Sequence, residues 1–397
     1  MQDADPGARY LVAPTHSLCD AVHAPTADMD IDRFRCTDTN EAFALLYFEA
    51  SHADGVANTT MLSVLALVQS LADVRTTRPL VILLPERRRV SEHLATILRH
   101  CAAVAALAAS GFRCSLVRVS RIPAPFTPTP AQAAATRPDL IGSVLAKLHA
   151  FHLKCATVVL LDADQVLTQN VDDLFVSARS WTRRDASDPC VIGSRAGRGG
   201  ANLLVLQPSE ELFQLILSRA RERHAHLAWH APEQELIGLA CPTASGVNSS
   251  RLGVHHHLPD SYSSSEFFCR RYGDAFDVLG AKVLHFLGGS KPWHLAPPGD
   301  GLVHWDQCVR LGSPVACRSA SDRMVASRCY KPPGRWVELE KRWAKWEKHP
   351  PNITTVRGAY ACCERFFSAW LLAFAAAQRV LRETERCRAL QGELARE

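Results

Sequence analysis

The 397-residue sequence lacks a large excess of either charge sign and also lacks a long hydrophobic run. Lys and Arg total 45 against 40 for Asp and Glu, and the basic residues are scattered rather than gathered in an arm. This distribution gives no indication of nucleic-acid binding. The longest apolar stretch near the C-terminus, 366–377, is too short to cross a bilayer as a helix, so we expect no transmembrane segment.

An export signal and cysteine pairs of metal-binding spacing are also missing from the sequence. The N-terminal residues contain neither the basic segment nor the apolar segment that a signal peptide combines. The 14 cysteines include no C-x-x-C pair, which leaves a zinc ribbon or a thioredoxin-like site without support. We therefore expect reduced thiols and a cytoplasmic location.

What the sequence does contain is the pattern of an α/β fold. Apolar residues make up 47% and charged residues 21%, which is ordinary globular usage and excludes a mainly disordered chain. Short apolar runs alternate with longer segments of helical periodicity. Strands are expected at 42–48, 79–85, 115–119, 156–161, 202–206 and 282–286. Helices are expected at 61–71, 90–108, 139–152 and from Glu210 onward, with Ser209 as the N-cap of the last.

This pattern predicts three parts: an N-terminal extension over 1–38, one α/β domain over 39–300 and a mainly helical region over 301–397. The last part contains a charged helix with Trp336, Trp343 and Trp346, followed by the apolar run 366–377. These helices could cover the domain, dimerise or touch a membrane surface. Core packing is favoured, because tryptophans on a helix are usually buried.

Two aspartates follow the expected strand 156–161. That strand is apolar on both faces, which predicts a central position, and ligands bind at the C-terminal ends of such strands. Asp162 and Asp164 are two residues apart, so in an extended chain both carboxylates point to the same side and can reach one Mg²⁺ or Mn²⁺ ion. The alternative is that the two aspartates simply end the strand and cap the next turn.

A second candidate segment begins at His285. A neutral imidazole can ligate a metal, Gly288 permits close approach of the backbone to a phosphate, and Lys291 supplies a positive charge for it. Each residue also has an ordinary explanation: a hydrogen-bonded core histidine, a turn glycine and a solvated lysine. Taken separately, the ordinary explanations are favoured.

Several segments considered together change this balance. In chain order they are 146–149 (AKLH), 160–167 (LLDADQVL), 170–175 (NVDDLF), 206–209 (LQPS), 233–234 (EQ), 285–288 (HFLG) and 291–293 (KPW). This combination resembles the glycogenin-like members of glycosyltransferase family 8. The resemblance extends over roughly 42–293 and includes the family's D-x-D motif.

The resemblance implies a GT-A fold, in which a Rossmann-like mixed sheet is flanked by helices. It also implies transfer of a sugar from a nucleotide-diphosphate donor, usually a UDP-sugar, with retention at the anomeric carbon. It assigns the metal, typically Mn²⁺, to Asp162, Asp164 and His285. It assigns binding of the donor diphosphate or sugar to five residues: Lys147, Asp162, Ala163, Gly288 and Lys291. It places Gln234 beside the anomeric carbon, with Glu233 next to it, as the catalytic candidates. Asp172 and Asp173 are expected to start a helix instead.

Some residues depart from the family pattern on the donor side. Gly200 stands where the family has an asparagine near the donor sugar, and Glu233 stands where it has an aspartate. The first strand reads Leu45-Leu46-Tyr47-Phe48 in place of the threonines that cradle the uridine, and His52 lies near the position of a family tyrosine. Recognition of the donor base is therefore expected to differ.

Another departure concerns the acceptor. Arg270 occupies the position of the tyrosine that glycogenins glucosylate on themselves, and Tyr272 aligns with a neighbouring tyrosine. The sequence therefore predicts a metal-dependent retaining hexosyltransferase that uses a UDP-sugar and an unidentified carbohydrate, protein or lipid acceptor. A non-catalytic nucleotide-sugar-binding protein and, less favoured, a self-glucosylating glycogenin are the alternatives, and a homodimer is compatible with each.

Overall fold

The structure is a computed structural model of the whole chain, and it describes the parts that surround the expected metal site. The described residues are 28–36, 40–48, 59–85, 91–108, 111–123, 138–181, 190–195, 203–222, 232–241, 256–265, 280–286, 369–370, 372–387 and 389. Predictions that concern His52, Gly200, Arg270, Tyr272, Gly288, Lys291 and the three tryptophans of the charged helix lie outside these residues.

The centre of the molecule is a mixed sheet in the order β1-β4-β3-β2-β5-β8-β7-β9. Its strands are β1 (Asp28–Asp30), β2 (Glu41–Leu46), β3 (Leu80–Pro85), β4 (Cys114–Val119), β5 (Thr157–Leu161), β7 (Ile192–Arg195), β8 (Leu203–Leu206) and β9 (His256–Leu258). The first five are parallel to one another, and β8 runs antiparallel to β5. The predicted α/β class is confirmed, and β5 lies inside the sheet as its apolar sequence predicted.

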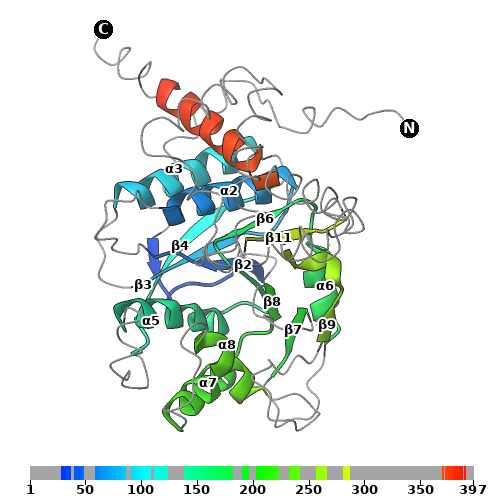
Figure 1. Cartoon of the computed structure of the whole chain (residues 1–397). Helices are drawn as coiled ribbons and strands as arrows, with labels where there is room; N and C mark the ends of the chain where they lie inside the picture. The colour runs from blue at the N-terminus through cyan, green and yellow to red at the C-terminus, as the bar shows by residue number, and fades with distance from the viewer. Residues whose placement is uncertain are drawn as a thin grey trace, which may run out of the picture.

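Helices cover both faces of this sheet (Figure 1). One face carries α2 (Thr59–Asp73), α3 (Glu92–Leu107) and α6 (Asp173–Arg179). The other carries α5 (Pro138–Leu145), the 3-10 helix η2 (Ala146–His152), α7 (Glu210–Glu222) and α8 (Pro232–Ala240). Side chains alternate along β2, so that Phe43 and Leu45 enter the first core while Ala42 and Ala44 enter the second.

Two local predictions about helices can be compared with the structure. Ser209 caps α7, since the Leu212 N–H donates to its Oγ at 3.1 Å, which confirms the predicted N-cap. The expected single helix 139–152 is instead α5 followed by the tighter η2. Residues 146–151 are buried throughout η2, so packing against the sheet decides the local geometry there.

A small second sheet lies against the first and orients the end of β5. It contains β10 (Ser264–Ser265), β11 (Val283–His285) and β6 (Gln165–Leu167), in that order. β6 and β11 are antiparallel, with His285 opposite Gln165. The Phe286 N–H also donates to the Asp164 carbonyl at 3.0 Å, which holds the end of β11 against the turn that follows β5.

The C-terminal part contributes to the main core. Residues 372–387 are helical and lie over α2 and α3 (Figure 1). Trp370 is 2% exposed, stacks on Phe374 with ring centroids 5.0 Å apart, and joins the core on that face of the sheet. Core packing is thus confirmed for this part of the apolar run. Within the described residues, no helix is long and apolar enough to span a membrane.

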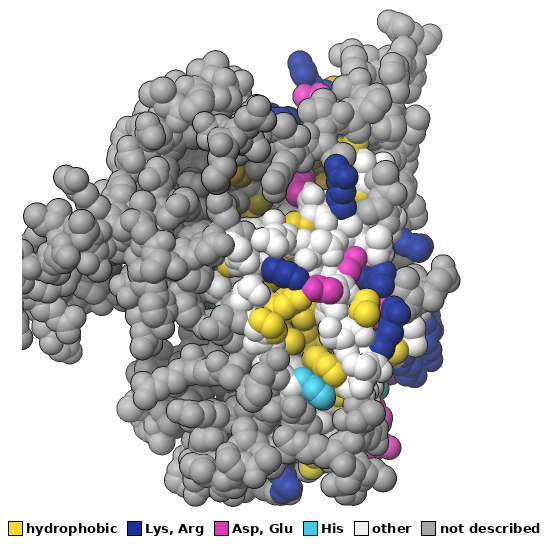
Figure 2. All heavy atoms as spheres, turned by 90° about the vertical axis from the view of Figure 1, so that its right-hand side faces the viewer, with side chains coloured by type: hydrophobic (Ala, Val, Ile, Leu, Met, Phe, Trp, Pro, Cys, Tyr) yellow, Lys and Arg dark blue, Asp and Glu magenta, His cyan; other side chains and the backbone are white. Residues whose placement is uncertain are grey.

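Figure 2 shows the face of the molecule turned 90° from the view of Figure 1. In its described part, acidic and basic side chains are interspersed around a small group of hydrophobic ones. The described part of this face therefore presents mixed charge rather than a field of one sign.

The prediction of reduced thiols is wrong for the described cysteines. Three disulfides join pairs of cysteines that both lie within the described residues: Cys36–Cys155, Cys101–Cys114 and Cys190–Cys241. Cys387 is also disulfide-bonded. The partners are 119, 13 and 51 residues apart in the sequence, so spacing alone could not indicate the pairs, which only the tertiary fold brings together. The cytoplasmic prediction loses the support that it took from reduced thiols.

Candidate metal centre

The candidate site lies where β5 leaves the main sheet. Leu161 is the last residue of β5, and the chain turns through Asp162, Ala163 and Asp164 before it enters β6. The third side chain, His285, ends β11, the antiparallel neighbour of β6. The site therefore takes its side chains from two strands that the sequence places more than a hundred residues apart, and it lies at the predicted C-terminal end of β5.

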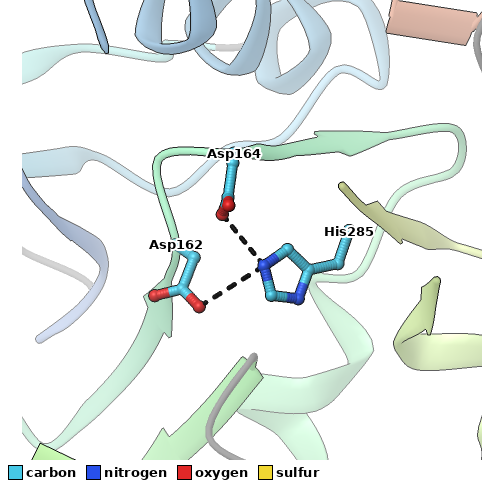
Figure 3. Close-up of side chains that lie close together, drawn as sticks. All are labelled: Asp162, Asp164 and His285. Atoms are coloured by element: carbon cyan, nitrogen blue, oxygen red, sulfur yellow. Dashed lines mark hydrogen bonds and ion pairs between the residues drawn. The ribbon is translucent and has the colours of Figure 1, made fainter. Parts of the chain in front are cut away.

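The three side chains converge on one point (Figure 3). The Nε2 atom of His285 lies 2.9 Å from Oδ1 of Asp164 and 3.7 Å from Oδ2 of Asp162. The histidine side chain is 3% exposed, whereas the two carboxylates are 21% and 22% exposed. The imidazole is thus fixed by burial, and the carboxylates close the side that remains partly open to solvent.

This donor set fits a divalent cation. One ligand atom from each residue can be chosen so that all three lie within 4.8 Å of one another, comparable with the roughly 4 Å between opposed ligands of one Mg²⁺ ion. Carboxylate oxygens suit Mg²⁺ and Mn²⁺, and a neutral imidazole is an additional ligand that transition metals accept. Both the type and the placement of the atoms therefore match the predicted ligand set.

Lys147 supplies positive charge beside this group. It lies in η2, its side chain is 8% exposed, and its ammonium contacts Oδ1 of Asp162. Burial by itself lowers the pKa of Lys147, but the charges of Asp162, Glu233 and Asp164 outweigh burial and raise the pKa above its ordinary value. The lysine therefore stays charged and faces the carboxylates.

The two catalytic candidates lie in the first turn of α8. Glu233 is 8% exposed and is near enough to Lys147 to raise the pKa of that ammonium, while Gln234 is half-buried. The structure thus places Glu233 near the same ammonium as the two aspartates. Three carboxylates and one ammonium have a formal charge of minus two, which one divalent cation would balance.

The remaining predicted site residues divide into two groups. Ala163 lies in the turn between the aspartates, where its side chain packs against the core. Gly288 and Lys291 lie outside the described residues, so their assignment to the donor stays a prediction. Asp172 and Asp173 start α6 as expected, and the Asp172 carboxylate accepts hydrogen bonds from Thr76 and Thr77 rather than joining the metal centre.

One residue of the site was missed in the sequence. Gln165 is fully buried, and its Oε1 atom accepts a hydrogen bond from the Asp162 N–H at 3.1 Å. The signal that could have indicated it is a long polar side chain at the first position of an otherwise apolar strand. Such a side chain needs a buried partner.

No protein-family model matches the sequence. The curated relatives are glycogenins: human glycogenin-2 is 35% identical over 164 residues, which is 40% of this chain and 29% of that protein. Rabbit (Oryctolagus cuniculus) glycogenin-1 is 32% identical over 162 residues, 40% of this chain and 44% of the relative. The matched segments thus span less than half the length of these relatives.

Two solved glycosyltransferase structures are also similar to parts of the chain. The apo-form glycosyltransferase GlyE of Streptococcus pneumoniae has a TM-score of 0.41 at 14% identity and covers 64% of this chain and 56% of its own. The galactosyltransferase LgtC, in complex with donor and acceptor sugar analogs, has a TM-score of 0.38 at 15% identity. The match covers 64% of this chain and 89% of the LgtC chain. From the sequence matches, the predicted resemblance to glycogenins is confirmed over about 40% of the chain.

Proposed function

We propose that the protein is a metal-dependent retaining glycosyltransferase of the GT-A type that transfers a hexose from a UDP-sugar to an acceptor. The observation that carries this proposal is the convergence of Asp162, Asp164 and His285 at the C-terminal end of β5. The similarity to glycogenins supports the same reaction class. Mn²⁺ is the favoured ion, with Mg²⁺ as the alternative, because one ligand is an imidazole.

The chain's own residues supply the parts that such a reaction needs. Asp162, Asp164 and His285 would hold the ion, whose chemistry is to neutralise charge on the donor diphosphate as the glycosidic bond to it breaks. Lys147 orients Asp162 and adds a fixed positive charge at the same place. Glu233 and Gln234, at the start of α8, are proposed to face the anomeric carbon, and Ala163, Gly288 and Lys291 to contact the donor.

The direct test is release of UDP from UDP-glucose and UDP-galactose, with and without Mn²⁺. Turnover that needs Mn²⁺ and is lost in Asp164→Asn would support the proposal. Asp173→Asn is a matched control, because it also removes one carboxylate but does so in the ion pair with Lys282, at the opposite end of β11. Undiminished turnover in Asp164→Asn would overturn the metal assignment.

A self-glucosylating glycogenin is the second candidate, and the 31–35% identity to glycogenins favours it. It would add hexose to a tyrosine of the chain itself, whereas the first candidate would glycosylate a separate acceptor. Mass spectrometry of the intact protein after incubation with each UDP-sugar separates the two. Mass increments of a hexose on Tyr272 or another tyrosine would establish the glycogenin activity, and an unchanged mass would remove it.

The catalytic unit is proposed to be the segment 39–300, with flanking parts that complete it. β1 pairs with β4 at the edge of the sheet, and the helical residues 372–387 cover α2 and α3. The acceptor is proposed to be a carbohydrate, a protein or a lipid headgroup. A screen of UDP release with representatives of these three classes would identify it.

A further inference from the structure

We propose that Gln165 is a positioning residue that sets the direction of the Asp162 carboxylate in the metal centre. This inference rests on the proposed function, because it concerns the same metal site. The side chain of Gln165 is 0% exposed and turns back over the aspartate turn, where its Oε1 accepts the Asp162 N–H at 3.1 Å. The contact closes a ring between the two ends of the turn.

The closed turn determines where both carboxylates point. The Asp162 N–H is fixed by Gln165, and the Asp164 carbonyl is fixed by the Phe286 N–H at 3.0 Å. His285 lies directly opposite Gln165 in the β6–β11 pair, so the pairing of these two strands fixes the position of the glutamine relative to the imidazole. The turn is therefore anchored once from its own strand and once from the strand that carries the imidazole.

Loss of the glutamine carbonyl would leave this arrangement without one anchor. A backbone N–H deprived of its acceptor in this half-buried turn seeks another partner, and the turn then shifts. A shift of the Asp162 backbone moves the carboxylate away from Nε2 of His285, with which it shares the candidate cation. Removing a hydrogen bond that orients a metal ligand typically lowers metal affinity 10- to 100-fold.

The test compares Gln165→Met with Gln165→Glu. Methionine keeps the length and volume of the side chain but removes the oxygen, whereas glutamate keeps an acceptor oxygen at the same position. Titration of the purified protein with Mn²⁺, followed by electron paramagnetic resonance, is expected to show affinity about tenfold weaker for Gln165→Met. Gln165→Glu, which keeps the acceptor oxygen and adds a carboxylate, is expected to bind Mn²⁺ at least as tightly as the wild type.

The control is Gln207→Met, which also removes a glutamine that bonds the backbone. Its Nε2 donates to the Ala178 and Trp181 carbonyls near the opposite end of β5, so it reports the effect of a lost hydrogen bond away from the metal. Wild-type Mn²⁺ affinity in Gln165→Met would overturn the positioning role. Absence of Mn²⁺ binding in the wild type would overturn the proposed function as well, so the two failures are distinguishable.

The disulfides carry a second and independent inference: we infer that the chain matures in an oxidising compartment. The three bridged pairs have Cα–Cα distances of 5.1, 5.8 and 5.8 Å, all within the range that a disulfide requires. Each pair joins segments that are separate in the fold, such as α3 to β4 for Cys101 and Cys114. Disulfides of this kind persist in secretory or extracellular surroundings and are rare in the cytosol.

For the proposed transferase, this inference narrows the acceptor to molecules of the secretory lumen or the cell exterior. The test uses the protein from cells that make it naturally, quenched in acid and alkylated under denaturing conditions before and after reduction. Mass spectrometry is expected to find Cys36, Cys155, Cys190 and Cys241 blocked until reduction. Cys241→Ser is the control, since it should release the Cys190 thiol alone among these four. Free thiols at all four positions before reduction would overturn the inference, whatever the enzymatic activity.

Discussion

Acidic side chains lie at both ends of the paired strands β2 and β5, and their charges are balanced in different ways at the two ends. Glu41 opens β2 opposite Thr157, whereas Asp162 follows the last residue of β5. Glu41 is 1% exposed, and its two carboxylate oxygens each lie 2.6 Å from an arginine Nε, that of Arg78 and that of Arg179. At this end of the β2–β5 pair, one carboxylate is therefore balanced by two arginine cations.

The other end has the reverse balance. The carboxylates of Asp162, Asp164 and Glu233 face one ammonium, that of Lys147, and an imidazole. Arginine is always charged and binds carboxylates with fixed geometry, so the Glu41 end is suited to hold the fold together. A site with excess negative charge at a partly open position is suited to an exchangeable cation. The contrast separates an ion-pair cluster that is suited to hold the fold together from the candidate metal site.

The largest effect is expected from Glu41→Ala. The substitution leaves Arg78, whose side chain is 15% exposed, without the carboxylate that balances it, and breaking a buried ion pair from one side costs about 3–5 kcal/mol of unfolding free energy. Chemical denaturation followed by circular dichroism would measure the loss. Mn²⁺ affinity of the folded variant should stay at the wild-type value, and a weakened affinity would show that the two ends are not independent.

Asp164→Asn is expected to lose activity and keep stability, the reverse of Glu41→Ala. It removes one metal ligand and should lower Mn²⁺-dependent release of UDP by about 100-fold, equivalent to ~2.7 kcal/mol of transition-state stabilisation. Because it also relieves repulsion between neighbouring carboxylates, the variant should unfold at no lower temperature than the wild type without metal. A variant that loses stability and activity together would assign Asp164 to the fold instead.

Metal addition should give a smaller and selective stabilisation. With free Mn²⁺ at ten times its dissociation constant, binding to the folded state alone raises the unfolding free energy by about 1.4 kcal/mol. Differential scanning fluorimetry should show this shift in the wild type and in Glu41→Ala but not in Asp164→Asn. An equal shift in all three proteins would indicate that Mn²⁺ binds elsewhere.

The smallest effect is expected within the Glu41 cluster itself. The side chain of Arg179 is 57% exposed and that of Arg78 is 15% exposed. Solvent therefore screens the Arg179–Glu41 ion pair more than the Arg78–Glu41 ion pair. Arg179→Ala should therefore lower the melting temperature less than Arg78→Ala does. The reverse order would show that the more exposed arginine is the important partner of Glu41.

The sequence predicted the central strands well because their apolar runs are long and bracketed by turn residues. Strand β5 and the aspartates after it followed from periodicity and position, and Ser209 followed from its place before α7. Short strands such as β1, β6, β7 and β9 were not predicted, since each includes polar or charged residues and forms no continuous apolar run. They form because neighbouring strands offer them hydrogen bonds.

The candidate site was predictable only in part from the residues themselves. The pairing of Asp162 with Asp164 is local, but the contact with His285 depends on the antiparallel pairing of β6 with β11, which the family resemblance indicated and periodicity did not. Neither spacing nor periodicity gave the position of Gln165 over the turn or the partners of Glu41. These contacts are tertiary, and so are the disulfides.

The division of the candidate metal ligands between two sheets has a consequence for how the site forms. The aspartates become available when β5 joins the main sheet, but the imidazole arrives only after β11 has paired with β6 across more than a hundred residues. Contacts of such long range form late, because a long loop must close first. A nascent or truncated chain that ends before residue 283 would hold both aspartates and lack the third ligand, so metal capture would report completion of the fold.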